Sequence, residues 1–469
     1  MVSIFKILFP LTVSILLSFA KTIRIRTVFV DPNDRWQVVE GWGTSLAWWA
    51  NKIGGYPDDI RNHIADLVFD VNKGLGLNVI RYNIGGGDNP DHNHMRPGGA
   101  VPGFLPCEIC SYNWTTDANQ KWILFAAQKR GANIFEAVSF SPPYWMTYSN
   151  CSSGSKHGTI DNLNVQYYDT FADYLTNIVE WFNNNGLIFR TLAPFNEPSS
   201  NWWKANGSQE GCHFACSTIN RIIKQVGIYL KDKGLSNQTS ISAADEYSTD
   251  SEVNIIKCID SDAKLYISQY NTHAYHGKKS KELFHLSQLD GKRLWMSEFG
   301  LQVSQDMSAS INLSEQILND MRNLKSAAWV YWQAVDEVAV NSWGLIGVNY
   351  SDTNILKNNL GFYGFAQYTK FIRPGYQIIT SNDHDTLAAC SPDNQTIVLV
   401  CTNKNNITEV WNLNVSIFNI NSFKAFRTSN NNETLTNLTI IPNITDGILT
   451  YFNPAYSITT WIFSLAIPI

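Results

Sequence analysis

Short apolar runs alternate with amphipathic stretches from about residue 39 to residue 335. Eight of the apolar runs have the length and composition of β-strands; they lie at 39–46, 77–84, 133–140, 187–195, 240–244, 266–273, 292–298 and 327–334. Helical periodicity or long loops fill the segments between them. One helical face predicted near 171–182 carries Phe171, Leu175, Ile178, Val179 and Phe182, and the run Asn-Asn-Asn-Gly at 183–186 ends that helix.

This alternation of β and α units predicts a parallel sheet, and eight units predict a closed (β/α)8 TIM barrel over residues 39–370. The alternative is a doubly wound open sheet, which usually has fewer strands and a glycine-rich phosphate turn before a helix. The run Gly-Gly-Gly-Asp at 85–88 leads into Pro and His residues instead of a helix. The barrel is therefore the favoured α/β fold.

The pattern changes after residues 371–375. Residues 371–469 are rich in Asn, Thr, Ile and Val, with short alternating runs and no helical period, which predicts a fused C-terminal side β-sandwich. Residues 23–30 alternate in the same way. We therefore expect the N-terminal segment 21–38 to join the sandwich.

The first twenty residues are typical of a secretory signal peptide. Lys6 precedes an apolar run, and Ser18-Phe19-Ala20 forms a small-x-small cleavage site. The alternative is a retained signal anchor, but the run is short for a membrane span. We therefore expect a secreted, extracellular protein that is not associated with a membrane after signal removal.

Cysteines and glycosylation sequons agree with export. The chain has 8 Cys and many Asn-x-Ser/Thr sequons, which suit disulfides and a glycosylated surface. Proximity suggests the pairs Cys212–Cys216 and Cys390–Cys401. The Cys107-x-x-Cys110 motif is alternatively half of a zinc site, but no matching pair stands at a suitable spacing.

Composition narrows the class of protein further. Of the 469 residues, 44% are hydrophobic and 16% are charged, which indicates a packed globular protein, and we expect a monomer. The net charge is -5 without a basic stripe, so nucleic acid is not an expected partner. Aromatic residues reach 13%, including 16 Trp and 20 Tyr. They suit binding to sugar rings, although a core role is the alternative for most of them.

Two glutamates follow apolar strands of the predicted barrel. Glu197 ends the fourth strand candidate, and Glu298 ends the seventh. Functional side chains of such barrels gather at the C-terminal ends of strands, so these two carboxyls are expected to face each other. Glycoside hydrolysis needs such a pair: one protonates the leaving oxygen, and the other attacks the anomeric carbon or activates water. A single Glu would more simply be a salt-bridged or exposed acid.

Six motifs resemble glycoside hydrolase family 30; they are GWGTSLAWWA (41–50), RYNIGGGD (81–88), SFSPPYWM (139–146), APFNEPSSNWW (193–203), THAYHG (272–277) and WMSEFG (295–300). The first and fourth are most similar to the fungal endo-β-1,6-galactanase branch. The resemblance spans nearly the whole mature chain. It implies a retaining mechanism by double displacement, with Glu197 as acid/base and Glu298 as nucleophile.

Four polar residues are candidates for the same site. Arg81 ends the second strand candidate and is suited to keep the nucleophile ionised and to bind a ring hydroxyl. Asn196 suits the hydroxyl beside the anomeric carbon. Tyr275 and His273 resemble family positions on the sixth strand that support Glu298. The alternatives are a structural ion pair for Arg81, a turn-forming Asn196 and a buried structural Tyr275.

Tryptophans complete the expected site. Trp145 and Trp332 are expected to wall the cleaved subsite, and further sugar platforms are expected among Trp48, Trp49, Trp202 and Trp203; core packing is the alternative for each. The run Asp-His-Asn-His-Met at 91–95 suggests a metal cluster, but sequence neighbours on a loop rarely coordinate together. The chemistry needs no metal and no cofactor.

The sequence thus predicts a secreted glycosidase that cleaves a polysaccharide. The expected substrate is β-linked galactan in polysaccharide side chains, and the expected activity is that of an endo-β-1,6-galactanase. One alternative is a β-1,6-glucanase or β-1,4-xylanase of the same family, with an unchanged catalytic pair and different loops. A more remote alternative is a sugar-binding protein without turnover, which the presence of both glutamates disfavours.

Overall fold

The computed structural model describes residues 24–302, 304, 306–338, 342–353, 356–440 and 442–468. The predicted signal peptide, residues 1–20, lies outside the described residues. Within the described ranges, no helix combines the length and apolar character needed to cross a bilayer.

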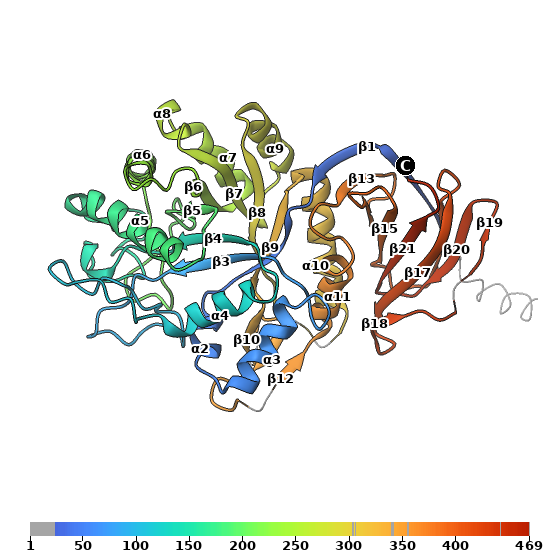
Figure 1. Ribbon diagram of the computed structural model, residues 1–469, viewed down its shortest axis with the longest axis horizontal. Helices are drawn as coiled ribbons and strands as arrows, with labels where there is room; N and C mark the ends of the chain where they lie inside the picture. The colour runs from blue at the N-terminus through green and yellow to red at the C-terminus, as the bar shows by residue number, and fades with distance from the viewer. Residues whose placement is uncertain are drawn as a thin grey trace, which may run out of the picture.

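A closed barrel of eight parallel strands forms the larger part of the molecule (Figure 1), as the alternating pattern predicted. Its strands, in spatial and chain order, are β2 (Gly41–Ser45), β3 (Val79–Ile84), β4 (Ile134–Ser139), β5 (Thr191–Ala193), β6 (Ser240–Ser248), β7 (Ile267–His276), β8 (Arg293–Phe299) and β9 (Ala328–Gln333). Strand β9 pairs with β2 and closes the ring.

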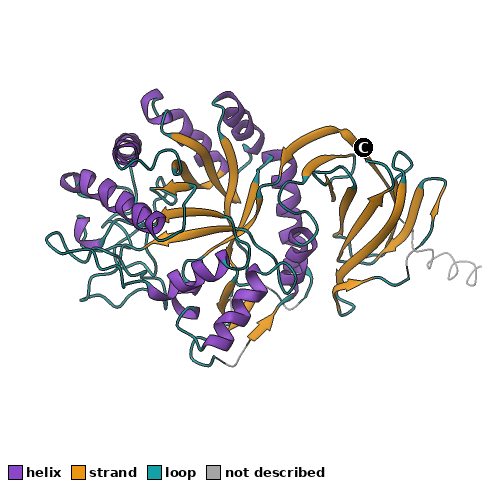
Figure 2. Ribbon diagram, in the orientation of Figure 1, coloured by secondary structure: helices purple, strands orange, loops and turns teal. Residues whose placement is uncertain are grey.

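Helices surround the barrel (Figure 2). They are α2 (Trp49–Ile53), α3 (Asp58–Phe69), α4 (Ala118–Gln128), α5 (Tyr168–Asn184), α6 (Cys216–Asp232), α7 (Thr249–Cys258), α8 (Ser261–Lys264), α9 (Ser280–Leu289), α10 (Ser308–Asn319) and α11 (Leu360–Thr369). Two short 3-10 helices are η1 (Tyr144–Met146) and η2 (Val165–Tyr167), and a π-helical segment, η3 (Asp320–Leu324), follows α10. Strands β10 (Val335–Glu337), β11 (Ile346–Val348) and β12 (Leu356–Asn358) form a small sheet after β9.

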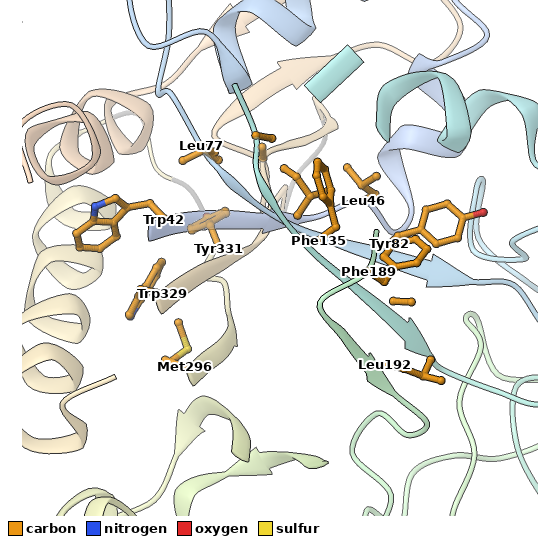
Figure 3. Packing of buried hydrophobic residues seen from close by; sticks show 14 of the residues in the cluster. Trp42, Leu46, Leu77, Tyr82, Phe135, Phe189, Leu192, Met296, Trp329 and Tyr331 are labelled. Atoms are coloured by element: carbon orange, nitrogen blue, oxygen red, sulfur yellow. The ribbon is translucent and has the colours of Figure 1, made fainter. Parts of the chain in front are cut away.

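Large apolar side chains fill the space between barrel and helices (Figure 3). Trp42, Tyr82 and Trp329 are fully buried there, and burial of each such side chain contributes about 1.5–3 kcal/mol. The predicted apolar face of α5 is buried along its whole length. The packing therefore follows the helical period that the sequence displays.

The barrel interior is different, because it holds a polar layer. Along β3, Ile80 and Tyr82 join the outer core, whereas Val79 belongs to a small inner apolar cluster and Arg81 forms ion pairs across the barrel. Side chains alternate between the two faces of a strand, which explains this division. Charged groups are thus held at the base of the barrel mouth.

A side β-domain carries the remaining strands (Figures 1 and 2). They are ordered β18-β17-β21-β15-β14-β13-β1-β16-β20-β19. Their bounds are β1 (Ile25–Val38), β13 (Gln377–Ser381), β14 (Thr386–Cys390), β15 (Thr396–Asn403), β16 (Glu409–Asn414), β17 (Ile420–Ser429), β18 (Glu433–Asn437), β19 (Ile444–Thr445), β20 (Ile448–Asn453) and β21 (Ser457–Leu465).

Strand β1 joins the two halves of this domain. Its first part pairs in parallel with β16, and its later part pairs antiparallel with β13. Trp411 and Leu413 on one half pack with Leu399, Trp461 and other residues of the second half in a separate core. The predicted fold, a barrel with a fused side β-sandwich, is confirmed.

Helices α10 and α11 connect the barrel to the side domain. The Ser314 hydroxyl is 2.6 Å from the hydroxyl of Thr402, and Gln367 donates to Thr428 at 2.9 Å and accepts from Thr460 at 2.6 Å. All of these groups are buried. Because buried hydrogen bonds are costly to leave unmade, they fix the two parts against each other.

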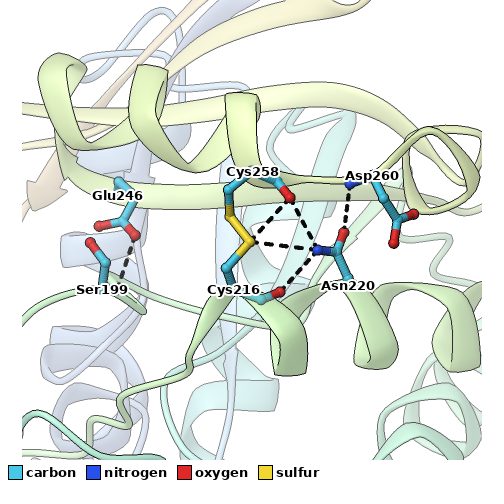
Figure 4. Close-up of a disulfide and its surroundings, with 6 residues drawn as sticks. All are labelled: Ser199, Cys216, Asn220, Glu246, Cys258 and Asp260. Carbon is cyan, nitrogen blue, oxygen red and sulfur yellow. Dashed lines mark hydrogen bonds between the residues drawn. A yellow bond between two sulfur atoms is a disulfide. The ribbon is translucent and has the colours of Figure 1, made fainter.

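The two cysteine pairs suggested by proximity are wrong. Cys216, at the start of α6, forms a disulfide with Cys258 at the end of α7 (Figure 4), and Asn220 donates to the backbone carbonyls of both cysteines. Cys107 pairs with Cys110, which removes the zinc alternative for that motif.

Strand register explains why the other suggested pair does not form. Cys390 lies opposite Ile397, and Cys401 lies opposite Thr386. The two cysteines are therefore four residue steps apart along the ladder, about 13 Å. A disulfide needs Cα atoms within roughly 7 Å.

Candidate active site

The barrel brings Glu197 and Glu298 together at its C-terminal mouth. Glu197 follows β5, and Glu298 lies near the end of β8. One carboxylate oxygen of each lies within 4.8 Å of the other. Both side chains are largely buried, with relative exposures of 6% and 4% for the residues. Residues 101 positions apart in the chain thus form one acidic pair.

Glu197 is held by its backbone as well as its side chain. Its φ is 48°, in the left-handed region, and its N–H donates to the carbonyl of Asp245 at 2.8 Å. Such a conformation costs on the order of 1–3 kcal/mol in a non-glycine residue, and it persists only where the surroundings impose it. Trp202 Nε1 lies 3.2 Å from one carboxylate oxygen, and His273 Nδ1 lies 3.0 Å from the other.

Glu298 has two donors. Arg81 Nη1 donates to Oε2 at 3.1 Å, and the Tyr275 hydroxyl donates to Oε1 at 3.1 Å. His273 Nδ1 is 3.4 Å from Oε1, so this imidazole lies between the two glutamates. Donors of this kind favour the ionised carboxylate.

A buried ion network lies beneath the pair. Arg81 is fully buried, donates to Glu136 at 3.1 Å, and also forms an ion pair with Asp245. Burial alone raises the pKa of Asp245, but the charges on Arg81 and His273 outweigh it and lower that pKa to about 2. Asp245 is therefore a permanent anion that holds both cations in place.

The protonation of the neighbours follows from the same charges. Burial lowers the pKa of His273, yet Glu298 and Asp245 raise it well above its ordinary value, so the imidazole is cationic. Burial, together with the nearby Glu298 and Glu197, raises the pKa of Tyr275 well above 10. Tyr275 therefore remains a neutral donor.

The pKa of Glu298 is set by the same competition between burial and charge. Burial raises it from 4.5 to about 7; the charges on His273 and Arg81 lower it, and those on Glu197 and Asp245 raise it. Burial outweighs the two cations, so Glu298 becomes fully ionised only above about pH 7.

A cavity of about 340 Å³ opens above the two carboxylates. Two groups of aromatic rings line it. In one, Trp202 packs against Tyr247, which stacks on Tyr275. In the other, Trp48 packs edge-on against Trp332 with ring centroids 5.0 Å apart. Such surfaces offer flat apolar faces to sugar rings.

Four buried polar atoms of lining residues have no hydrogen-bond partner in the described structure. They are Asn196 Oδ1, Gln333 Oε1, Trp48 Nε1 and Arg96 Nε. Buried polar atoms are nearly always paired, so four unpaired ones around one cavity indicate groups reserved for a polar ligand. Two acceptors and two donors suit the hydroxyls of a sugar.

Most of the predicted site residues fall into two groups. The first group lines the cavity with the glutamates and consists of Trp48, Asn196, Trp202, Trp203, Tyr275 and Trp332. Arg81 and His273 are fully buried beneath the carboxylates, so they contact the glutamates rather than the cavity.

Trp145 and Trp49 require correction. Trp145 is not among the lining residues; its indole donates to the Leu105 carbonyl and packs edge-on against Tyr167. Trp49 is fully buried and donates to the Ser45 carbonyl. Sequence position alone did not reveal that these two rings lie outside the cavity lining.

The sequence analysis missed other members of the site. Tyr247, Trp343 and Arg96 line the cavity, and Asp245 belongs to the ion network. Asp245 and Tyr247 lie at the end of the fifth barrel strand. An acidic and an aromatic residue at the C-terminal end of a barrel strand could have been recognised in the sequence as candidate site residues.

Two groups of donor side chains in the described chain come close enough to hold a metal ion. The first is Glu197, His273 and Glu298, where the Arg81 guanidinium already supplies positive charge 3.1 Å from Glu298. A second cation is therefore disfavoured there. The second group, Asp88, His92, His94 and Cys151, lies outside the cavity lining.

Comparison with known proteins gives a consistent result. The model of O-glycosyl hydrolase family 30 matches residues 25–273. An endo-β-1,6-galactanase of Hypocrea rufa is 34% identical over 403 residues, which cover 80% of this chain and 81% of that protein.

Solved structures share the fold. The catalytic domain of a GH30 xylanase C from Talaromyces cellulolyticus superposes with a TM-score of 0.73 at 20% identity, covering 94% of this chain and 100% of that one. An endo-β1,6-glucanase superposes with a TM-score of 0.70 at 17% identity, covering 94% of each chain.

Proposed function

The chain belongs to O-glycosyl hydrolase family 30 and is a glycosidase, and on that premise we propose that it is a secreted endo-β-1,6-galactanase with a retaining mechanism. The substrate proposal is carried by one observation, the 34% identity to the Hypocrea rufa galactanase over most of both chains. The mechanism is supported by the carboxylate geometry.

The separation of the two carboxyls favours retention. Retaining glycosidases place them about 5–5.5 Å apart, whereas inverting ones leave about 6.5–9.5 Å for a water molecule. Here oxygens of Glu197 and Glu298 lie within 4.8 Å. That spacing leaves room for a direct attack on the sugar and too little for an intervening water.

In the first step, the Glu298 carboxylate attacks the anomeric carbon, and Glu197 donates its proton to the bridging oxygen. Arg81 and Tyr275 donate to Glu298 and stabilise its ionised form. In the second step, Glu197 takes a proton from water, which attacks the anomeric carbon and releases Glu298. Two displacements restore the β configuration.

The remaining residues orient the sugar and the carboxyls. Asn196 binds the hydroxyl beside the anomeric carbon through its unpaired Oδ1, and such a hydrogen bond strengthens in the transition state. Trp48, Trp203 and Trp332 contact the flat faces of sugar units. His273 and Arg81 hold the glutamates from below, so they position the pair.

A panel of polysaccharides tests the substrate. We expect release of β-1,6-galacto-oligosaccharides of several lengths from β-1,6-galactan at early times, and at least about 100-fold slower release from β-1,6-glucan and β-1,4-xylan. Chromatography of the products gives both results. Gentio- or xylo-oligosaccharides as the main products would move the assignment to those substrates, and a single disaccharide from the outset would indicate exo action.

We also predict a falling acidic limb of activity. Burial raises the pKa of Glu298 to about 7, and this nucleophile attacks only as the carboxylate, so kcat/KM on galactan should fall as the pH drops through about 7, approaching tenfold per pH unit. A pH–rate profile measures this. In a Glu197→Ala variant assayed on an activated aryl glycoside, the charge of Glu197 no longer raises the pKa of Glu298, so the acidic limb should move to lower pH. A wild-type profile that stays flat from about pH 8 down to about pH 5 would contradict the raised pKa of Glu298.

A further inference from the structure

Four metal-ligating side chains meet on loops beside the cavity, and the glycosidase mechanism uses none of them. Asp88, His92 and His94 lie on the loop between β3 and α4, and Cys151 lies on the loop between β4 and α5. One ligand atom from each lies within 4.8 Å of the other three. The sequence displays the two histidines together, but the fold adds a thiol from a residue far along the chain.

Two of the six separations among the four donors match the edges of a tetrahedron around zinc, and the rest are within 4.8 Å. Cys151 Sγ is 3.5 Å from His94 Nε2, and His92 Nδ1 is 3.4 Å from Asp88 Oδ1. Zinc bonds of about 2.3 Å to sulfur and about 2.0–2.1 Å to nitrogen or oxygen give tetrahedral edges of about 3.5 Å and about 3.4 Å for these two pairs. The donors of these two pairs therefore already stand at ligand spacing.

His94 is oriented as a ligand. Its Nδ1 is 2.6 Å from the carbonyl of Gly207. A carbonyl only accepts, so Nδ1 carries the hydrogen and, in the neutral ring, the lone pair of Nε2 faces Cys151. Metal-bound histidines commonly donate their other N–H to a carbonyl in this way, which fixes the tautomer and the ring orientation.

His92 and Cys151 strengthen this interpretation. Nδ1 of His92 is buried and has no hydrogen-bond partner in the described structure. Cys151 is buried, with 1% relative exposure, and is not in a disulfide. The Cys151 thiol already contacts the Ser153 hydroxyl at 3.0 Å, so the unsatisfied group of the cluster is the His92 ring nitrogen, which an ion would pair.

We propose that Asp88, His92, His94 and Cys151 bind one zinc ion. A thiolate, two imidazoles and a carboxylate form a tetrahedral donor set typical of Zn²⁺. Binding releases the thiol proton of Cys151 to solvent, and the thiolate and the Asp88 carboxylate then neutralise the two charges of the ion. All four positions are filled by protein, so the ion has a structural role.

The ion would fasten three loops that border the cavity. Gly207 belongs to the loop between β5 and α6, which supplies Trp202, Trp203 and Gln209 to the lining. Ser153, two residues after Cys151, donates to the Lys204 carbonyl and accepts from the Gly207 N–H, each at 3.0 Å. Zinc would add a cross-link at the point where these loops already touch. This inference does not depend on the polysaccharide that is cleaved.

Metal binding to the untagged full-length chain tests the proposal. After dialysis against a chelator, the protein is titrated with Zn²⁺, and elemental analysis of the dialysed product should give one zinc per chain. Competition with a chromophoric chelator gives the Kd. His94→Ala and Cys151→Ser should each weaken zinc binding by at least about 100-fold. His157→Ala, an exposed histidine on the same loop as Cys151, should leave the Kd unchanged.

Cobalt binding can be measured on the native chain, so this test does not depend on the folding of any variant. Co²⁺ added to the native chain should give a near-ultraviolet sulfur-to-cobalt charge-transfer band and the visible bands of tetrahedral cobalt. Saturating zinc should also raise the melting temperature of the native chain and of His157→Ala. Absence of the charge-transfer band, or equal zinc affinity in the native chain and His94→Ala, would overturn the site and leave an adventitious ion only.

Discussion

Replacing Glu298 with alanine is expected to lower kcat/KM on every substrate by on the order of 10⁵-fold. The glycosyl–enzyme intermediate forms on this carboxylate, and its loss removes the nucleophile whatever the leaving group. Arg81 keeps its contacts with Glu136 and Asp245, so the barrel should remain folded. Initial rates on galactan and on an aryl β-1,6-galactobioside measure the loss, and circular dichroism checks the fold.

Chemical rescue makes the assignment specific. With the aryl substrate, added azide should enter the space left by Glu298 and give a glycosyl azide of inverted configuration, because only one displacement occurs. Glu315→Ala, an exposed residue on α10 that pairs with Lys404 at the surface, is the matched control and should retain full activity. A β-glycosyl azide from the Glu298 variant would assign the nucleophile elsewhere.

Replacing Glu197 with alanine is expected to lower kcat/KM much more for substrates with a poor leaving group than for substrates with a good one. Hydrolysis of galactan should fall by about 10⁴-fold, because the sugar leaving group needs a proton. For an aryl glycoside with an acidic phenol, kcat/KM should change by less than about tenfold, while kcat falls because the intermediate accumulates. The ratio of kcat/KM values for the two substrates, measured with the same variant preparation, is the readout.

The Glu197 variant also has its own rescue product. Azide needs no general base, so it should attack the accumulated intermediate and give a β-glycosyl azide after two displacements. Equal losses on galactan and on the aryl glycoside would refute the acid/base role. The opposite azide configurations of the two variants thus distinguish acid/base from nucleophile.

The fold was accessible from the sequence because local patterns repeat. All eight predicted strands form the barrel, and the apolar face of α5 is buried as its spacing indicates. Strand β5 is short, Thr191–Ala193, yet the apolar run 187–195 marked its place. A pattern that recurs eight times tolerates errors of a few residues in each element.

The site was accessible only in part. Glu197 and Glu298 stand out because each carboxylate follows an apolar run, but Trp145 follows one as well, and its ring turns toward Leu105. The difference arises from contacts with another loop, which no local pattern records. The same holds for Cys216, whose partner Cys258 lies a whole helix–strand–helix unit away.

Strand β1 determines whether the side domain can be produced separately from the barrel. Ile25–Phe29 pair with Val410–Asn414, and Val28 is fully buried in the side-domain core. This first strand has no partner until the ribosome has made most of the chain, and such non-local pairing is slow to form. A fragment cut near residue 371 would lack an interior strand and expose two open edges, which invite intermolecular association. The side domain is therefore not a detachable module.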